Sequence, residues 1–515
     1  MKNSATEMYR SLRVLSWQHL WEVEVPKFDE GSEAYRSEQV ALVRAVGVVF
    51  LESGHASQRG DVLDWMRRLL GDANERIRRY AMAALPKIGS REEVELELTG
   101  FVREVSGERE LRHAGRALAK VAGRGAIEAI EEMPAGVAQK IKAGAAREVG
   151  GRILLDKLIP GAEGLRIHLR GRRGLEGFVR SEYDANHCLR ERMQFAGHSS
   201  GVVALEALDA LTLGDLFSMR CFGTLNVVLG EVDRDLAAIA QVIASEPSFR
   251  ILEALTDGVP RYRLEFVGEG HRRGAVAEIA ERVHGLRPGL LNDARSAMWA
   301  VDLHPIGRRV SVELRPRLSP DPRFSYRLAD VPAASHPPLA ASMARLAGRG
   351  ESVWDPFCGS GLELVERAKL GGVSRIYGSD LSGEALRIAG RNMEAARVDG
   401  VHVLRRCDFR DFPRIAGIHA GDVAQIITNP PLGRRVPIPD LKAMIADLFA
   451  VAAEVLRPGG VLVLANPVGS DWRHDSRLER NFSQRVDFGG FDCRIERYLK
   501  KGMGRVPKAR SFLQG

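Results

Sequence analysis

Cysteine is scarce in this sequence, and long apolar runs are missing from it. The five cysteines are scattered and none lies in a Cys-x-x-Cys pair, so neither a disulfide framework nor a metal site is indicated. No apolar run approaches the roughly 20 residues that cross a bilayer. The first residues also lack the apolar core of a secretory signal. These absences favour a reduced, cytoplasmic protein that does not contact a membrane.

The composition is that of folded protein, with 45% hydrophobic and 28% charged residues. A chain of 515 residues is too long for one hydrophobic core, so we expect several domains. The net charge of +8 favours a polyanionic partner, because bound phosphates release counterions. A solvated, arginine-rich surface is the alternative explanation of that charge.

Residues 1–150 have the pattern of consecutive helices. Two stretches, Arg79–Ile88 and Arg112–Val121, repeat each other 33 residues apart, a period typical of stacked helix pairs. Trp65 and Leu69 are the predicted core of the helix before them. The region resembles HEAT-like repeats, and such a domain is a candidate site for a protein partner. A generic helical bundle stays open, since repeat arrays normally need several units to bury a core.

Residues 164–318 combine strands and helices in an α+β pattern that follows a Gly- and Pro-punctuated linker at 153–164. The alternation of apolar and basic residues in Leu165–Arg170 is typical of a half-buried strand. Further strands are predicted at 225–229, 262–267, 299–303 and 310–314, with helices at 173–180, 215–220, 235–244 and 276–283.

This middle region resembles the part that precedes the catalytic domain in THUMP-containing RNA methyltransferases. The resemblance rests on Arg-Gly-Leu-Glu at Arg173, on the segment Asp215–Arg220, and on the hairpin pattern of residues 299–314. It implies a ferredoxin-like, THUMP-like unit that grips RNA, with tRNA favoured over rRNA.

Residues 322–515 begin with a Pro-rich segment, and a short strand then leads into Asp355-Pro-Phe-Cys-Gly359-Ser-Gly361. Glycines permit a tight turn and close backbone approach to a ligand, and the N-terminus of the following helix favours negative charge. Helices are predicted at 339–346, 362–369 and 442–456, strands at 353–355, 375–380, 401–404, 423–427 and 461–465, a turn at 457–460, and a terminal hairpin of 482–488 with 491–499.

Two acidic residues follow the next two predicted strands. Asp380 stands 21 residues after Gly359, where a carboxylate can accept the protons of ribose hydroxyls. Asp408 can accept from an adenine amine. A nicotinamide-binding Rossmann site shares this logic, but the first element here is not Gly-x-Gly-x-x-Gly, and Asn429-Pro-Pro-Leu432 follows the strand at 423–427.

The four elements, in this order and spacing, resemble class I methyltransferases that modify exocyclic amines. The resemblance implies a Rossmann-like, seven-stranded α/β sheet with its last strand antiparallel, and S-adenosyl-L-methionine as the cofactor. It assigns cofactor binding to His336, Asp355, Phe357, Gly359, Gly361, Asp380, Leu381, Asp408, Phe409 and Asn429, and catalysis to Asn429, Pro430, Pro431 and Leu432.

The Asn-Pro-Pro motif suits the chemistry of an exocyclic amine, whose lone pair is delocalised into the ring. The side-chain oxygen of Asn429 and the carbonyl of Pro430 can each accept one N–H bond, which holds the nitrogen in line with the methyl group. The two prolines fix the turn. No general base with a shifted pKa is required. His336 belongs to a Pro-Ala-x-x-His-Pro element that lies beside the methionine part of the cofactor in the family, although capping of the next helix is an equal alternative.

Four positions depart from the family pattern or extend it. Leu432 stands where the family has Tyr or Phe, whose ring stacks on the target base. Leu362, after Gly361, replaces a capping Thr, so we expect Ser360 to cap that helix instead. Arg434 and Arg435 are either phosphate ligands or solvated loop charges.

Together these patterns predict a three-part RNA methyltransferase that acts on an exocyclic amine, with guanine N2 of tRNA as the favoured target. Adenine N6 is the alternative base. Leu432 leaves open a catalytically weak or inactive RNA-binding scaffold, and the motif alone also fits protein glutamine or DNA adenine methyltransferases.

Overall fold

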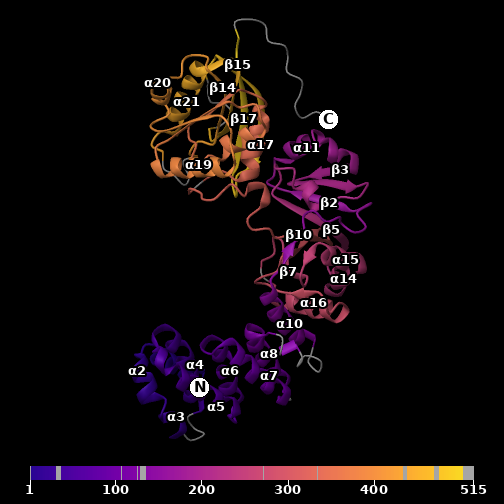
Figure 1. The fold of residues 1–515 in the computed structure, drawn as a ribbon, viewed down its shortest axis with the longest axis vertical. Coiled ribbons are helices and arrows are strands. Elements are labelled where there is room, and N and C mark those ends of the chain that lie inside the picture. The colour runs from indigo at the N-terminus through magenta and orange to yellow at the C-terminus, as the bar shows by residue number, and fades with distance from the viewer. Residues whose placement is uncertain are drawn as a thin grey trace. The chain divides into compact units, whose positions relative to one another are not determined.

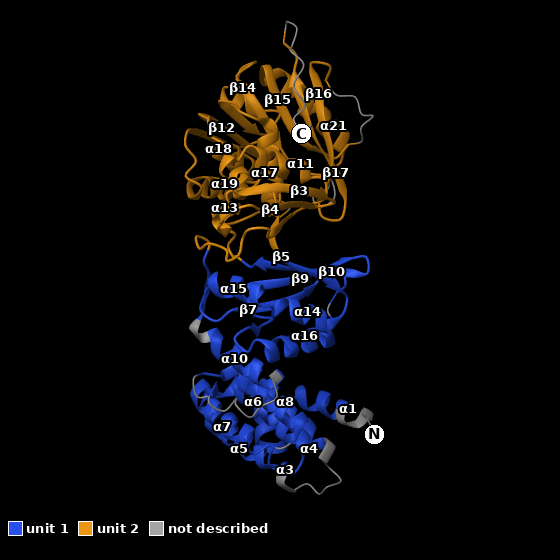
Figure 2. Cartoon of the chain, turned by 90° about the vertical axis from the view of Figure 1, so that its right-hand side faces the viewer, with its two compact units in different colours: residues 1–154, 229–317 blue, residues 155–228, 318–515 orange. Residues whose placement is uncertain are grey.

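The computed structural model describes residues 2–30, 36–105, 107–123, 126–127, 135–270, 272–332, 334–432, 438–468 and 475–502. The chain forms two compact units (Figure 2). Unit 1 holds residues 1–154 and 229–317, and unit 2 holds residues 155–228 and 318–515. The division into domains at 1–150, 164–318 and 322–515 stays a prediction.

Unit 1 begins with a helical region in which α4, α6, α8 and α10 pack in succession, while α5 and α7 pack beside α6 and α8 (Figure 1). Its helices are α1 (Lys2–Arg13), α2 (Trp17–His19), a π-helical turn (Leu20–Glu24), α3 (Lys27–Glu30), α4 (Arg36–Ser53), α5 (Arg59–Arg68), α6 (Glu75–Ile88), α7 (Arg91–Glu104), α8 (Glu108–Val121) and α10 (Ala135–Val149).

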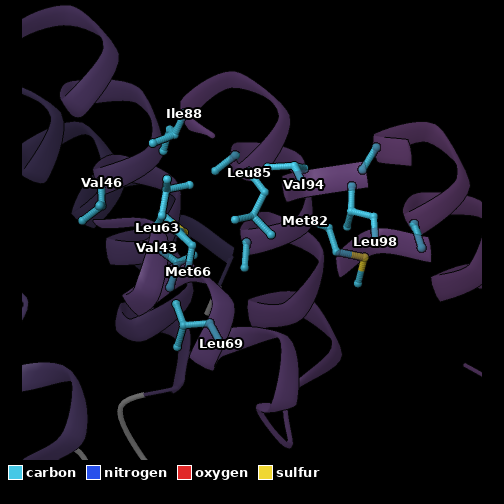
Figure 3. Packing of buried hydrophobic residues seen from close by; sticks show 14 of the residues in the cluster. Val43, Val46, Leu63, Met66, Leu69, Met82, Leu85, Ile88, Val94 and Leu98 are labelled. Carbon is cyan, nitrogen blue, oxygen red and sulfur yellow. The ribbon is translucent and has the colours of Figure 1, made fainter. Parts of the chain in front are cut away.

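The repeat found in the sequence has a structural counterpart, because α6 and α8 are 14 residues long and begin 33 residues apart. The buried residues at equivalent positions are Ala81, Ala84, Leu85 and Ile88 in α6, and Ala114, Ala117, Leu118 and Val121 in α8. Figure 3 shows side chains from α4, α5, α6 and α7 converging on one interior. Trp65 and Leu69 are buried, as predicted. The small alanines at equivalent positions of α6 and α8 let neighbouring helices approach closely.

The rest of unit 1 is a mixed sheet with helices. Here β9 (Trp299–Ile306) and β10 (Arg309–Pro316) form the predicted hairpin, and β7 (Arg261–Phe266) runs parallel to β9. The other elements are the end of β5 (Thr224–Asp233), β8 (Leu291–Asn292), the pair β1 (Arg152–Ile153) and β6 (Thr256–Asp257), and the helices α14 (Leu236–Ile243), α15 (Glu246–Ala254) and α16 (Arg273–Leu286).

The first part of unit 2 is antiparallel, with strand order β3-β4-β2-β5. Its elements are β2 (Arg166–Arg170), β3 (Met193–Ser199), β4 (Val202–Ala207), the start of β5, α11 (Glu176–Asp184), α12 (His187–Arg192) and α13 (Leu213–Leu216). The helix predicted at 215–220 is wrong. A capping box of Thr212 and Asp215 starts the helix earlier, and α13 ends at Leu216.

The second part of unit 2 is a seven-stranded sheet of order β13-β12-β11-β14-β15-β17-β16. Strands β11 to β15 are parallel, and the last strand, β17, is antiparallel to both β15 and β16, as predicted. The bounds are β11 (Ser352–Asp355), β12 (Arg375–Asp380), β13 (Val401–Arg406), β14 (Val423–Thr428), β15 (Leu456–Asn466), β16 (Leu478–Asp487), β17 (Asp492–Lys500), α17 (Pro337–Ala347), α18 (Leu362–Lys369), α19 (Gly383–Ala395), α20 (Phe412–Ala416) and α21 (Leu441–Val455).

The prediction of a turn at 457–460 is wrong. These residues lie inside β15, where they form an irregularity of the strand. Leu456 pairs with Val423 and Val461 with Gln425, so the residues between them bulge from the ladder. Gly459, with a φ of 76°, permits that path.

Buried ion pairs join the two parts of unit 2. The guanidinium of Arg220 donates two bonds of 2.7 Å to Glu366, which is 1% exposed and also accepts from the hydroxyl of Tyr326. Arg345 pairs with the buried Glu182 at 2.7 Å. Removing one partner of such a pair leaves an uncompensated charge, at a cost of about 3–5 kcal/mol. The small sheet is thus fixed against the large one.

Within the described ranges, no helix combines the length and the apolar character that crossing a membrane requires.

Candidate active site

A cavity of about 1280 Å³ opens at the carboxyl ends of the parallel strands in unit 2. These ends are where the ligands of open α/β sheets bind. The predicted site residues in its wall are His336, Phe357, Gly359, Asp380, Leu381, Asp408, Phe409, Asn429, Pro430, Pro431 and Leu432. The two remaining predicted residues, Asp355 at the end of β11 and Gly361 in the turn that follows, are not part of the wall.

The glycine turn between β11 and α18 adopts left-handed backbone at two positions, with φ of 49° at Gly359 and 81° at Gly361. A Cβ atom on Gly361 would lie 3.1 Å from the Cβ of Ala389, so a side chain there would be both strained and crowded. The expectation that Ser360 caps α18 is wrong. Gly361 occupies the N-cap position, and the Ser360 hydroxyl donates to Asp330 at 2.8 Å.

Asp355 ends β11 and is fully buried. Its Oδ1 atom accepts from the hydroxyl of Thr428 at 2.6 Å and from the backbone N–H of Phe357 at 3.0 Å. Its Oδ2 atom is buried and has no hydrogen-bond partner within the described part of the chain. Burial raises the pKa of Asp355 well above its usual value, and the neighbouring carboxyl of Glu363 raises it further. A cation beside Oδ2 would act in the opposite direction and lower the pKa of Asp355.

Asn429 follows β14 and is the end of a short hydrogen-bond chain. Its side-chain nitrogen donates to the hydroxyl of Ser335 at 2.8 Å, and that hydroxyl donates to Glu363. Glu363 is buried in α18, and burial raises its pKa. The Oδ1 atom of Asn429 is buried without a partner in the described structure. The amide is therefore oriented with its nitrogen satisfied and its oxygen available.

Asp380 ends β12 and braces the glycine turn. Its two oxygens accept from the backbone N–H groups of Gly359 at 3.0 Å and Ser382 at 2.8 Å. Each carboxylate oxygen has a second lone pair, so two acceptor sites remain for a ligand in the cavity. Leu381, the next residue, is 69% exposed at the cavity mouth.

Asp408 and Phe409 follow β13. Asp408 is paired with Arg410 at 2.8 Å, and Arg410 is also paired with Asp447 at 2.8 Å. The ring of Phe409 lies 4.9 Å from the ring of Phe357, measured between centroids. The two rings give this end of the cavity an apolar wall next to a carboxylate.

His336 stands at the N-cap position of α17, yet its side chain makes no capping bond. Its Nδ1 atom is buried without a partner in the described structure. Burial lowers the pKa of His336 to about 4, and the nearby cation Arg172 lowers it further. The imidazole in the cavity wall is therefore neutral at neutral pH.

Two phenylalanines that the sequence interpretation passed over lie in the cavity wall, which Leu432 also lines. Phe488 and Phe491 come from the turn between β16 and β17, and their ring centroids are 6.0 Å apart. Arg434 and Arg435 lie outside the described residues.

Arg172, Ser335 and Glu363 are also cavity residues that the sequence interpretation missed. Glu363 carried a signal, since it is an acidic residue in a helix that otherwise turns an apolar face to the sheet. Arg172 carried none, because it reaches the cavity from the other part of unit 2.

Comparison with known proteins shows what the sheet and its cavity are similar to. The sequence model described as "RMKL-like, methyltransferase domain" matches residues 325–494. The curated tRNA (guanine(10)-N2)-dimethyltransferase of Methanothermobacter thermautotrophicus is 28% identical over 204 residues, which cover 39% of this chain and 55% of that protein. The chain thus spans about half the length of that curated relative.

Solved structures share the fold at lower identity. TrmN from Thermus thermophilus is 20% identical, with a TM-score of 0.53 over 65% of this chain and 99% of that one. A possible methylase from Clostridium difficile is 16% identical, with a TM-score of 0.50 over 67% of this chain and 100% of that one. Residues 325–494 are therefore similar to the RMKL-like methyltransferase domain, a kind of domain that uses S-adenosyl-L-methionine as the methyl donor.

Proposed function

We propose that this protein transfers a methyl group from S-adenosyl-L-methionine to an exocyclic amine of a base in structured RNA, namely guanine N2 of tRNA. The observation that carries the proposal is the buried, unpartnered Oδ1 atom of Asn429 in the cavity wall. A buried acceptor without a partner costs about 1–3 kcal/mol, so its retention points to a ligand donor. An amine N–H is such a donor.

The residues of the cavity suit this cofactor in charge and shape. We assign the cofactor's ammonium group to the orphaned Oδ2 of Asp355, its ribose hydroxyls to Asp380, and its adenine to Asp408 with the rings of Phe357 and Phe409. When bound, the cofactor supplies an electrophilic sulfonium methyl. His336, neutral and half-buried, lines the methionine side of this pocket.

The protein's part in the reaction is to hold the amine. Asn429 Oδ1 and the carbonyl of Pro430 each accept one N–H bond, which aligns the nitrogen with the methyl group and favours its pyramidal form. The N–C bond forms as the S–C bond breaks, and the extra proton on nitrogen leaves to water. Since Ser335 and Glu363 anchor the amide nitrogen, Asn429 cannot turn its oxygen away without losing that bond.

Leu432 offers no ring for the target base, and the proposal assigns that role to the turn between β16 and β17. Phe491 is half-buried and lines the same cavity as Leu432, and the buried Phe488 lines it as well. Stacking on an aromatic side chain contributes about 1–3 kcal/mol per base. This compensation favours an active enzyme over a scaffold that only retains the fold.

The choice of RNA rests on the surroundings of the catalytic domain. The basic composition and the THUMP-like character of residues 164–318 support a structured RNA, and the named function of the curated relative supports guanine N2 of tRNA. The helical region is proposed to be a HEAT-like array, supported by the 33-residue offset of α6 and α8.

The test is mass spectrometry of nucleosides from the RNA of a strain that lacks the gene. We expect N2-methylguanosine to decrease in tRNA, to return with the wild-type gene, and not to return with Asn429→Ala. An unchanged set of methylated nucleosides in the deletion strain would refute the substrate assignment, and loss of N6-methyladenosine would replace guanine by adenine.

A further inference from the structure

The exposed side of α6 and α8 in unit 1 is basic at positions that the 33-residue repeat makes equivalent. Arg76, Arg79 and Lys87 of α6 correspond to Arg109, Arg112 and Lys120 of α8. Within each helix these residues follow helical spacing and share one face. We call the basic face the set Arg76, Arg79, Lys87, Arg109, Arg112, Arg116 and Lys120, together with the exposed Lys140 of α10.

Contacts show that these residues form one surface and not separate charges. The carboxylate of Glu75 lies 3.5 Å from Arg79 of its own helix and 3.7 Å from Arg109 of the next. His113, in the middle of α8, has its pKa lowered by burial and then by Arg79 and Arg116. The cations of the two helices therefore face the same solvent region.

The positive charge of the basic face is only partly neutralised by neighbouring carboxylates. Burial lowers the pKa of Lys120, and the cations Lys87 and Arg295 lower it further. Burial likewise lowers the pKa of Lys140, with Arg116 as the next cause. In the described structure no carboxylate forms an ion pair with Lys87, Arg116 or Lys120, and Arg112 pairs only with Glu108 of its own helix.

The neighbouring helices do not share the basic character of this face. α7, which packs on α8, carries Glu92, Glu93, Glu95, Glu97 and Glu104 against two arginines, and α5, which packs on α6, mixes three arginines with two aspartates. The cations gathered on the basic face indicate a polyanionic occupant of that side.

We propose that the basic face binds the phosphate backbone of RNA. At 1.5 Å per residue, Arg109 to Lys120 extends over about 16 Å, along which a nucleic-acid duplex presents roughly nine phosphates. The long, exposed side chains suit phosphates, whose recognition needs charge more than fixed geometry. This inference goes beyond the proposed function, because it gives the helical region a role in RNA affinity, and it rests on that function only for the choice of RNA.

The test measures binding of the full-length protein to unfractionated tRNA by fluorescence anisotropy across a salt series. In Arg112→Gln/Arg116→Gln/Lys120→Gln, we expect a dissociation constant raised at least tenfold. The slope of log affinity against log salt should fall by about 2–3, since each lost phosphate contact removes about 0.9.

The matched control is Arg10→Gln/Arg13→Gln/Arg103→Gln, which removes the same charge from exposed positions of unit 1 that lie outside both the basic face and residues 164–318. We expect its affinity to change less than twofold. Lys87→Gln/Lys120→Gln, at repeat-equivalent positions, should weaken binding about fivefold, and it replaces the triple variant if circular dichroism shows that the triple does not fold.

Equal losses in the two triple variants would overturn the proposal, because the effect would then come from net charge alone. An unchanged affinity in the basic-face variants, or wild-type protein that binds an acidic protein instead of tRNA, would also overturn it. The two proposals fail separately. Weaker tRNA binding by the basic-face variants would support this inference even if the nucleoside analysis showed that the methyl acceptor had been assigned wrongly.

Discussion

In unit 2, the side chains of Asp355 and Asn429 are each held by hydrogen bonds from or to a neighbour and keep one oxygen for a ligand, whereas most cations of the basic face in unit 1 are exposed to solvent on long side chains. Asp355 is buried and Asn429 is half-buried, and one buried oxygen of each has no hydrogen-bond partner in the described part of the chain. Arg109 and Arg112 are 69% and 54% exposed. The first arrangement selects by geometry and the second attracts by charge, so changes in the two places should alter different quantities.

The largest effect is expected from Asn429→Ala, which removes the acceptor for the amine. Loss of one such preorganised group typically costs about 10²–10³-fold in kcat. We expect that loss in single-turnover methyl transfer, with tRNA affinity and cofactor affinity within threefold of wild type. A tenfold weaker tRNA affinity would contradict the separation of the two regions.

Asp355→Asn should lower cofactor affinity by about 10–100-fold, because a hydrogen bond to a charged group contributes about 1.5–3 kcal/mol. The pKa of Asp355 is raised in the free protein, and the ammonium of the cofactor lowers it again. Binding should therefore release a proton, and affinity should increase with pH up to the raised pKa. Calorimetry in buffers of different ionisation enthalpy measures this release, which the Asn variant should lack.

The same shift affects stability with a defined sign. A carboxyl with a raised pKa in the fold stabilises it below the pKa of the unfolded chain, and this contribution is lost as pH rises through the folded value. As pH rises from the unfolded to the folded pKa, the melting temperature of the cofactor-free protein should therefore fall more steeply than that of the Asp355→Asn variant. A parallel pH dependence of the two proteins would show that Asp355 is not the responsible group.

Phe491→Ala tests how the cavity recognises the target base, since this ring would contact the base itself. Loss of the stacking face should raise KM for tRNA roughly tenfold. Phe491→Trp should restore it, and Arg103→Gln serves as a surface control. If Phe491→Ala leaves KM unchanged while Leu432→Ala raises it, the base lies against Leu432.

Glu363→Gln should have the smallest effect, a decrease in kcat of about fivefold with KM unchanged. The side-chain oxygen of the introduced glutamine can still accept from the Ser335 hydroxyl, but a neutral hydrogen bond is about half as strong as a charge-assisted one. Ser335→Ala should decrease kcat further, because Asn429 then loses its anchor. An effect on KM alone would show that Glu363 does not position Asn429.

The sequence was sufficient for the elements around the cofactor motif. Helix α18 and strand β12 have the predicted bounds, because turn glycines and short apolar runs mark both ends. Strands β3 and β4 escaped prediction. β4 contains helix-favouring Ala, Leu and Glu residues, and β3 is interrupted by a register shift between Phe195 and Gly197.

The site was predictable only where its residues lie in local motifs. Asn429 and Ser335 are 94 residues apart, and Arg172 enters from the other part of unit 2. Such contacts depend on tertiary packing, which no local pattern encodes. Phe491 could have been suspected from its hairpin turn, but its presence in the cavity follows from the antiparallel insertion of β17 between β15 and β16.

The central claim, that the cavity holds an exocyclic amine of guanine against Asn429, is tested most directly by the identity of the product. Purified protein, methyl-labelled S-adenosyl-L-methionine and unfractionated tRNA from the deletion strain are incubated, and the digested nucleosides are separated. The account predicts label in N2-methylguanosine, decreased about 10²–10³-fold by Asn429→Ala. Label in another nucleoside or in protein, or equal labelling by the variant, would contradict it.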